Sequence, residues 1–158
     1  MQLDDIDLKI IQLLLEDGRF SHTAIGKETG LTAPSVYSRI QRLEKEGIIQ
    51  GYSALINADK IGRGLVAFVR VRTMASVGEG NEFEKFILRE PQVLECYDVD
   101  GEDSYILKIR TNSPQTLRSL LVRIRSMPGI THTQTSIALM TLKESATAAP
   151  LPGWHDEK

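Results

Sequence analysis

Residues 32–47, TAPSVYSRIQRLEKEG, have the pattern of one amphipathic helix. Thr32 is a good N-cap, Pro34 lies in the first turn where its missing N–H is tolerated, and Gly47 suits the end of a helix. At about 100° per residue, the apolar side chains that share one narrow arc are Val36, Ile40 and Leu43. The segment therefore predicts a helix with one buried side and an opposite side that is free to contact something else.

The side opposite these apolar residues is polar and carries no carboxylate. Small residues early in a helix allow close approach to base edges, and Gln and Arg side chains match the adenine and guanine edges of the major groove. A plain solvated face is the alternative, but the absence of acids favours contact with DNA. The outward arc contains Pro34, Ser35, Ser38, Gln41, Arg42 and Lys45, with Tyr37 and Arg39 at its flanks.

Two shorter helices precede this one. Asp4 can cap a helix that ends before Gly18, and Ser21 can cap a second helix that ends at Gly30. A helix, a short turn centred on glycine and a further helix make the outline of a helix-turn-helix. The first 17 residues are mainly acidic, whereas residues 19–42 are mainly basic, so the basic block coincides with the proposed DNA-contacting helix.

The pattern changes from helical spacing to extended runs after Gly47. Residues 48–63 suggest a linking strand and hinge, and residues 64–143 then repeat the order strand, helix, strand. The last of these strands is expected over residues 130–142. A faint internal repeat, VRVRT at 69–73 and LKIRT at 107–111, supports this order. Two such units make a ferredoxin-like βαββαβ domain. The predicted fold class is α+β, with a helix-turn-helix (winged-helix-like) domain over 1–47 and a flexible tail over 144–158.

One face of the predicted sheet has no helix to cover it. Its two central strands would place Val66, Phe68 and Ile106 on that face, beside the cations Arg70, Arg72, Lys108 and Arg110. Apolar residues on both faces of a sheet suggest that something covers the second one, and another copy of the chain is the simplest candidate. We therefore expect a two-fold homodimer.

No constellation of residues points to catalysis. The three histidines are scattered, none has metal-ligand spacing to Cys96, and no phosphate-binding glycine loop is present. We expect Cys96 to be a strand cysteine packed in or near the core rather than a nucleophile. The predictions are no catalytic residue, no metal and no cofactor, so the protein is not expected to be an enzyme.

The one concentrated polar stretch is DVDGEDSY, residues 98–105, with four acids around Gly101. It lacks the remaining ligands of a calcium loop, and acids with glycine are also common in plain hairpin turns. A turn with free backbone groups beside carboxylates could hold the charged ends of an amino acid, the carboxylates meeting its ammonium group.

Composition places the chain among soluble globular proteins, with 41% hydrophobic and 25% charged residues and a formal net charge of −2. No apolar run approaches the ~18 residues of a membrane span. The acidic N-terminus lacks the order of a signal peptide. The single cysteine excludes an internal disulfide and fits a reducing compartment. We therefore expect a cytoplasmic protein that does not enter a membrane.

Over residues 3–143 the chain resembles the Lrp/AsnC family of bacterial and archaeal transcription regulators. The stretches that carry the resemblance are LDDIDLKIIQLLLEDGRFS (3–21), GLTAPSVYSRIQRLEKEGIIQGYSALIN (30–57), and GEDSYILKI (101–109) followed by PGI (128–130). The resemblance implies that the third helix enters the major groove of operator DNA. Together with Lys45 from the outward arc, the predicted DNA-binding residues are Ser35, Tyr37, Ser38, Arg39, Gln41, Arg42 and Lys45.

The resemblance also implies that the C-terminal domain forms dimers through its sheet, that dimers assemble further, often to octamers, and that an amino-acid effector binds between dimers near the acidic turn. The predicted effector-binding residues are Asp100, Gly101, Glu102, Asp103 and Ser104. Many members have an acid directly before the aromatic of that turn, where this chain has Ser104, so the effector stays open.

The leading hypothesis is a sequence-specific DNA-binding transcriptional regulator whose assembly or DNA affinity is modulated by a small effector, an amino acid. The alternative is an amino-acid-sensing module that acts through protein partners, with its N-terminal helices serving only for docking. Such a module would bind its ligand without a salt-dependent affinity for DNA.

Overall fold

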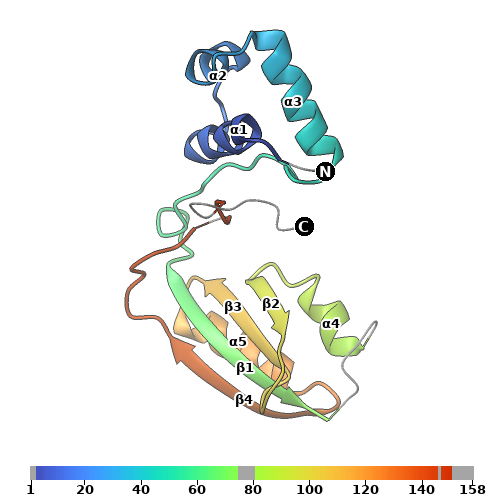
Figure 1. The fold of residues 1–158 in the computed structure, drawn as a ribbon. Coiled ribbons are helices and arrows are strands. Elements are labelled where there is room, and N and C mark those ends of the chain that lie inside the picture. Colours follow the sequence, from blue (N-terminus) through green and yellow to red (C-terminus); the bar gives the residue numbers. More distant parts are fainter. Residues whose placement is uncertain (1–2, 75–80, 146, 151–158) are drawn as a thin grey trace. The chain divides into compact units, whose positions relative to one another are not determined.

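The computed structural model describes residues 3–74, 81–145 and 147–150 (Figure 1). The chain divides into two compact units, with the change from the first to the second between Leu55 and Ile56. Each unit has a hydrophobic core of its own. No helix in the described ranges is both long and apolar enough to cross a membrane. Trp154 and most of the predicted flexible tail lie outside the described residues.

The N-terminal unit contains α1 (Asp5–Glu16), α2 (His22–Thr29) and α3 (Ala33–Lys45), drawn from blue to cyan in Figure 1. The three predicted N-caps are confirmed, because Asp4, Ser21 and Thr32 each accept a hydrogen bond from a backbone N–H of the first turn. Apolar residues of all three helices form the core: Ile10, Leu13, Ile25, Val36, Ile40 and Leu43. The helix-turn-helix prediction is therefore confirmed.

The turn between α2 and α3 depends on two glycines. Gly30 ends α2 with a φ of 74°, in the left-handed region that glycine adopts without strain. Gly26 is buried, and a Cβ atom there would lie 2.5 Å from the Leu31 carbonyl oxygen. The absence of a side chain at this position lets the turn pass close to α2.

The C-terminal unit is a four-stranded antiparallel sheet with strand order β2-β3-β1-β4. Along the chain its elements are β1 (Leu65–Thr73), α4 (Glu82–Ile87), β2 (Val93–Asp98), β3 (Tyr105–Thr111), α5 (Pro114–Arg125) and β4 (Ile130–Ile137). This order and pairing confirm the predicted ferredoxin-like βαββαβ fold.

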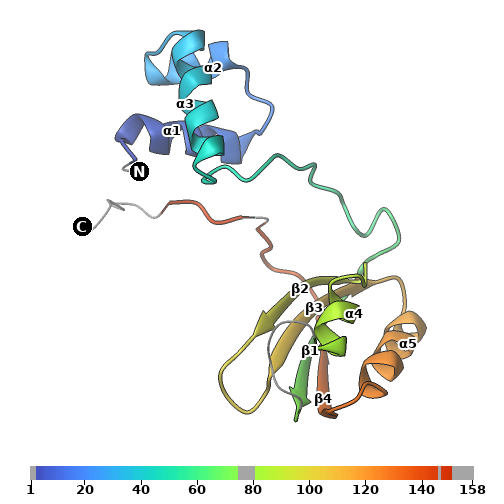
Figure 2. The same ribbon diagram turned by 90° about the vertical axis from the view of Figure 1, so that its right-hand side faces the viewer.

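Both helices of this unit lie on the same side of the sheet (Figure 2). They cover the face on which alternate residues of β1 and β3 are buried: Ala67, Val69, Val71, Tyr105, Leu107 and Ile109. Within the described residues no helix covers the other face, where the Phe68 side chain is 44% exposed. The burial predicted for the two central strands is therefore confirmed except at Val66, which was placed on the uncovered face but is only 6% exposed.

Three local predictions are wrong. Residues 48–63 contain no strand, because an extended segment needs a neighbouring backbone for its hydrogen bonds and has none in the described chain. For the same reason the described residues of the N-terminal unit include no wing strand. The last strand ends at Ile137 rather than near Leu142, which is 87% exposed. Cys96 is exposed rather than packed in the core, because β2 is an edge strand.

Candidate nucleic-acid interface and effector turn

Helix α3 has two distinct sides. Val36 and Leu43 have no exposed surface and Ile40 almost none. Of the predicted DNA-binding residues, Arg39 is half-buried and the others are exposed: Ser35, Tyr37, Ser38, Gln41, Arg42 and Lys45. The structure therefore brings these seven residues together along the side of one helix that faces away from its core.

The first turns of α3 carry small side chains that project little from the helix. The hydroxyl oxygens of Ser35 and Thr32 are 2.9 Å apart, and the Ser38 hydroxyl donates to the Pro34 carbonyl at 3.0 Å. Both serines thus bond within the helix and project little. Tyr37 extends further, and its ring centroid lies 5.5 Å from that of His22 on α2. A flat polar surface with one aromatic beside it can approach base edges closely.

Arg39 and Arg42 form ion pairs within the N-terminal unit, although the helical pattern places them on or beside the outward side of α3. Arg39 contacts both Asp4 and Asp7, at 2.7 and 2.8 Å, and Arg42 contacts Asp7 at 2.6 Å. The Asp7 side chain has no exposed surface. Both guanidinium groups therefore fasten α3 to the start of α1, and their predicted contact with DNA stays a prediction.

The charges of this network also act on Asp4. The hydrogen bond from Arg39 and that from the Asp7 backbone N–H lower the pKa of the Asp4 carboxyl below its ordinary value. Asp4 and Asp7 form a capping box at the start of α1, each accepting from the backbone N–H of the other. The sequence pattern identified Asp4 as a cap but gave Asp7 no role of its own, because nothing local shows that arginines 32 and 35 positions away bond to Asp7.

Gln41 is held by a neighbouring carboxylate. Its amide Nε2 donates to Glu44 Oε2 at 2.9 Å, and the hydroxyl of Tyr52 donates to Glu44 Oε1 at 3.0 Å. Desolvation and the Glu44 carboxylate raise the pKa of Tyr52 to about 12. Lys45 is exposed and has no ion-pair partner in the part of the chain that the structure describes. It is therefore the cation of α3 that is most available to DNA.

The predicted effector turn is fastened to β1 by Ser104. The Ser104 backbone N–H donates to the Val71 carbonyl at 2.9 Å, and the Ser104 hydroxyl accepts from the Thr73 N–H at 3.1 Å. The Val99 N–H donates to the Ser104 carbonyl at 3.1 Å and closes the turn. Gly101 lies within it with a φ of 140°, which favours glycine. In this chain the serine thus fixes the shape of the turn.

The carboxylates of this turn are partly matched by arginines of the uncovered sheet face. Arg72 donates to the Glu102 carbonyl at 2.7 Å and lies 3.3 Å from its carboxylate. Asp103 lies 3.9 Å from Arg72 and 4.0 Å from Arg70, whereas Asp100 is exposed. The turn therefore presents both signs of charge, and sequence reasoning missed the two arginines as its neighbours.

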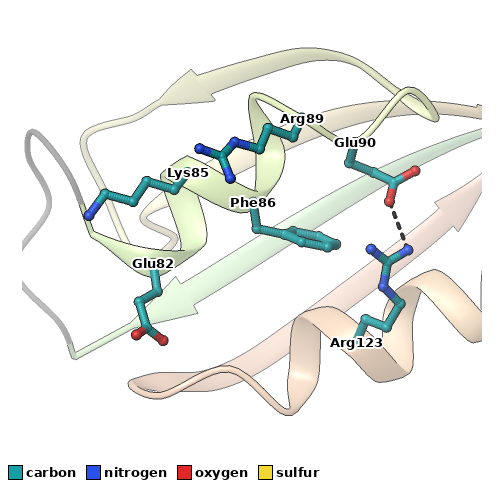
Figure 3. A pocket seen from close by; sticks show the side chains of 6 residues that line it. All are labelled: Glu82, Lys85, Phe86, Arg89, Glu90 and Arg123. Carbon is teal, nitrogen blue, oxygen red and sulfur yellow. Dashed lines mark hydrogen bonds and ion pairs between the residues drawn. The ribbon is translucent and has the colours of Figure 1, made fainter.

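A separate pocket of about 410 Å³ lies between α4 and α5 and contains none of the predicted effector residues (Figure 3). Arg123 stacks over the Phe86 ring at 4.6 Å and bonds to Glu90 at 2.8 Å. Burial raises the pKa of Glu90, but the hydrogen bonds from Gln92 and Arg123 outweigh it and leave the pKa lowered. Arg123 thus joins α5 to Phe86 of α4 and to Glu90 in the segment after α4, at one wall of the pocket.

The described residues offer little for metal or nucleophilic chemistry. Within these ranges no three His, Cys, Asp or Glu side chains lie close enough together to hold a metal ion. Desolvation and the nearby carboxylates Glu84 and Asp98 raise the pKa of the Cys96 thiol to about 11. A thiol with that pKa is protonated near neutral pH and is a poor nucleophile.

Two family models match the chain. Residues 3–44 match the AsnC-type helix-turn-helix domain, and residues 66–148 match the Lrp/AsnC ligand binding domain. The transcriptional regulator FL11 of Pyrococcus furiosus is 34% identical over 143 residues, which cover 90% of this chain and 93% of FL11. The regulator LrpA of Mycobacterium tuberculosis is 37% identical, covering 88% of this chain and 91% of LrpA.

Solved structures show the same architecture. A feast or famine regulatory protein of M. tuberculosis complexed with L-methionine superimposes with a TM-score of 0.83 at 35% identity, covering 94% of this chain and 99% of that one. A transcriptional regulator of Neisseria meningitidis in complex with L-Met gives 0.82 at 26% identity, covering 92% and 96%.

Proposed function

The chain belongs to the Lrp/AsnC family of transcriptional regulators, and from this premise we propose that it binds operator DNA through α3 and a small effector through its C-terminal unit. Residues 1–47 would bind DNA, 48–63 would link, 64–143 would bind the effector and assemble, and 144–158 would form a flexible tail. The family members reported above are regulators of transcription rather than enzymes.

The observation that supports DNA binding is the exposed side of α3 within a helix-turn-helix. Its serine side chains project little from the helix, Gln41 presents an amide, and Lys45 presents an exposed cation. Side chains of these kinds read base edges and contact phosphates. The alternative, a sensing module that acts only through protein partners, is not favoured. It explains neither the acid-free outward side of α3 nor the match of residues 3–44 to an AsnC-type helix-turn-helix domain.

An amino acid is the effector class that fits the turn best. Both solved complexes named above contain L-methionine. In this chain the turn combines backbone groups and the carboxylates of Glu102 and Asp103 with the guanidinium groups of Arg70 and Arg72. A zwitterion has one end for each sign of charge. Ser104 would act by fixing the turn rather than by charge.

The uncovered sheet face supports a homodimer. Phe68 is 44% exposed there, and an apolar residue among cations on a flat sheet suits a two-fold contact between identical faces. Further assembly, such as an octamer, would bring effector turns of different dimers together. We also propose that the protein acts in the cytoplasm, because the proposed target is operator DNA.

Charge reversal at Lys45 tests the DNA-binding proposal. Lys45→Glu should weaken binding to operator DNA about tenfold and reduce the salt dependence of the affinity, because it removes one cation from the contact. The measurement is fluorescence anisotropy with labelled promoter DNA at several salt concentrations. Lys9→Glu on α1 makes the same charge change on an exposed residue and is the matched control. Equal affinities of the two variants would contradict the proposal.

Arg42→Glu, although suggested by the sequence pattern, is a poor test. It would place a second carboxylate beside the buried Asp7 and would unfold the unit for reasons unrelated to DNA. The effector is tested separately by a thermal-shift screen of the standard amino acids. A ligand at 100 times its Kd should stabilise the protein by about 2.7 kcal/mol. No shift with any of them would remove the amino-acid switch and leave DNA binding untouched.

A further inference from the structure

A chain of two hydrogen bonds connects the linker to the exposed side of α3. It runs from the Tyr52 hydroxyl to one oxygen of the Glu44 carboxylate, and from the other oxygen to the Gln41 amide, at 3.0 and 2.9 Å. All three residues belong to the N-terminal unit. An i, i+3 pair such as Gln41 and Glu44 is ordinary on a helix surface. The added constraint is Tyr52, which comes from the linker beyond the helix.

The contact with Glu44 decides which way the Gln41 amide faces. A carboxylate only accepts hydrogen bonds, so the NH₂ group of Gln41 must point toward it. The amide then keeps one N–H and its carbonyl oxygen for other partners. Those two groups are the pair that binds the N7 and N6 edge of adenine. If Glu44 were free to move, the amide could turn over and present these groups in the wrong order.

Tyr52 restricts Glu44 in turn. Its ring lies over Gly18, just past the end of α1, with one ring carbon 3.7 Å from the point where a Cβ atom of Gly18 would be. Its hydroxyl is protonated at neutral pH and donates to Glu44; burial and the Glu44 carboxylate raise its pKa further, to about 12. The carboxylate is thus fixed on one oxygen by the linker and on the other by the recognition helix.

The linker is anchored at its other end as well. The Arg63 guanidinium donates to the carbonyl oxygens of Pro91 and Arg110 in the C-terminal unit, at 2.7 and 2.9 Å. Between these anchors residues 53–62 form neither helix nor strand. Among the described residues, the bond from Tyr52 to Glu44 is the last side-chain hydrogen bond between the linker and the N-terminal unit before this stretch.

We propose that Tyr52 is a positioning residue for DNA recognition: through Glu44 it fixes the amide of Gln41 in the orientation that reads one base pair. This inference rests on the proposed DNA-binding function and adds a specificity determinant that lies outside α3. It also gives the linker a direct route to alter base preference without moving the helix.

Selection of sites from random double-stranded DNA by the full-length protein tests this inference. Gln41→Ala should lose preference at one base pair of each half-site and so locate the pair that Gln41 reads. Tyr52→Phe keeps the ring but removes the hydroxyl, and it should relax preference at that same base pair by about two- to tenfold, the range for one hydrogen bond. In the Gln41→Ala background, Tyr52→Phe should cause no further change.

Gln12→Ala is the matched control, because it removes another exposed Gln–Glu hydrogen bond, to Glu16 on α1, and should leave all preferences unaltered. Thermal melting checks that each variant is folded. Glu44→Ala, which removes both of the oxygens that accept from Gln41 and Tyr52, serves as a second variant expected to relax the same base pair. The inference is overturned if the folded Tyr52 or Glu44 variant weakens binding to all sequences equally or leaves the base preference unchanged. It is also overturned if Gln41→Ala changes the preference at no base pair. If the wild-type protein selects no sequence at all, the proposed function itself fails.

Discussion

Two pairs of arginines, one in each unit, use the same chemistry in different surroundings. In the N-terminal unit, Arg39 and Arg42 contact Asp7, which is fully buried, at 2.8 and 2.6 Å. In the C-terminal unit, Arg70 and Arg72 approach the carboxylates of an exposed turn only to 3.3–4.0 Å. A buried charge that loses its partners destabilises the fold strongly, whereas exposed ion pairs contribute little. The first pair therefore holds a unit together, and the second is available to a ligand.

The largest effect is expected from removing both cations beside Asp7. The double variant Arg39→Gln, Arg42→Gln should lower the free energy of unfolding of the N-terminal unit by about 3–5 kcal/mol, because the buried carboxylate is left without a countercharge. Hydrogen exchange of the backbone amides in α1 and α3 measures this unit alone. A loss below about 1 kcal/mol would show that burial does not distinguish the two arginine pairs.

A smaller effect on stability is expected from the matching double variant Arg70→Gln, Arg72→Gln. It should cost less than about 1 kcal/mol of unfolding free energy in the C-terminal unit, since its ion pairs are exposed. The same variant should abolish any thermal shift produced by an amino acid, if these guanidinium groups meet the ligand carboxylate. Retention of the full ligand-induced shift would contradict that role.

The smallest effect concerns Asp4 and pH. Because its pKa is lowered in the folded protein, mainly by the hydrogen bond from Arg39, its contribution to stability is present above the ordinary value of 3.8 and is lost as the pH falls through the lowered pKa. Asp4→Asn should therefore lose less stability than the wild type between about pH 5 and the acid limit. Acid titrations followed by circular dichroism measure this difference.

Asp5→Asn removes a neighbouring exposed carboxyl that makes no contact with Arg39 and is the control for the acid titration. If its acid profile changed as much as that of Asp4→Asn, the Arg39 contact would not be the cause.

Most of the fold could be predicted from local patterns. The caps Asp4, Ser21 and Thr32, the apolar arc of α3 and the alternation in β1 and β3 all depend on nearby residues, and, apart from Val66, the structure confirms them. The acidic turn was also found in sequence. Its role as an effector site, like the DNA contacts of α3, stays a prediction.

The features that the sequence did not reveal depend on distant partners. A helical projection places Arg42 outward, but its long side chain bends back to Asp7, 35 residues earlier. Strand propensity in residues 48–57 has no effect without a backbone to pair with. Cys96 lies in a strand with apolar neighbours, and only the strand order shows that this strand is at the edge.

The buried Asp7 limits how the DNA specificity of this protein can be redesigned. Exchanging the whole of α3 for the recognition helix of another regulator would remove the two cations that Asp7 requires, unless the donor helix carried arginines at the same positions. Randomisation restricted to positions 35, 38, 41 and 45 avoids this conflict. A library built on those four positions would change base recognition while keeping the contacts on which the folding of the unit depends.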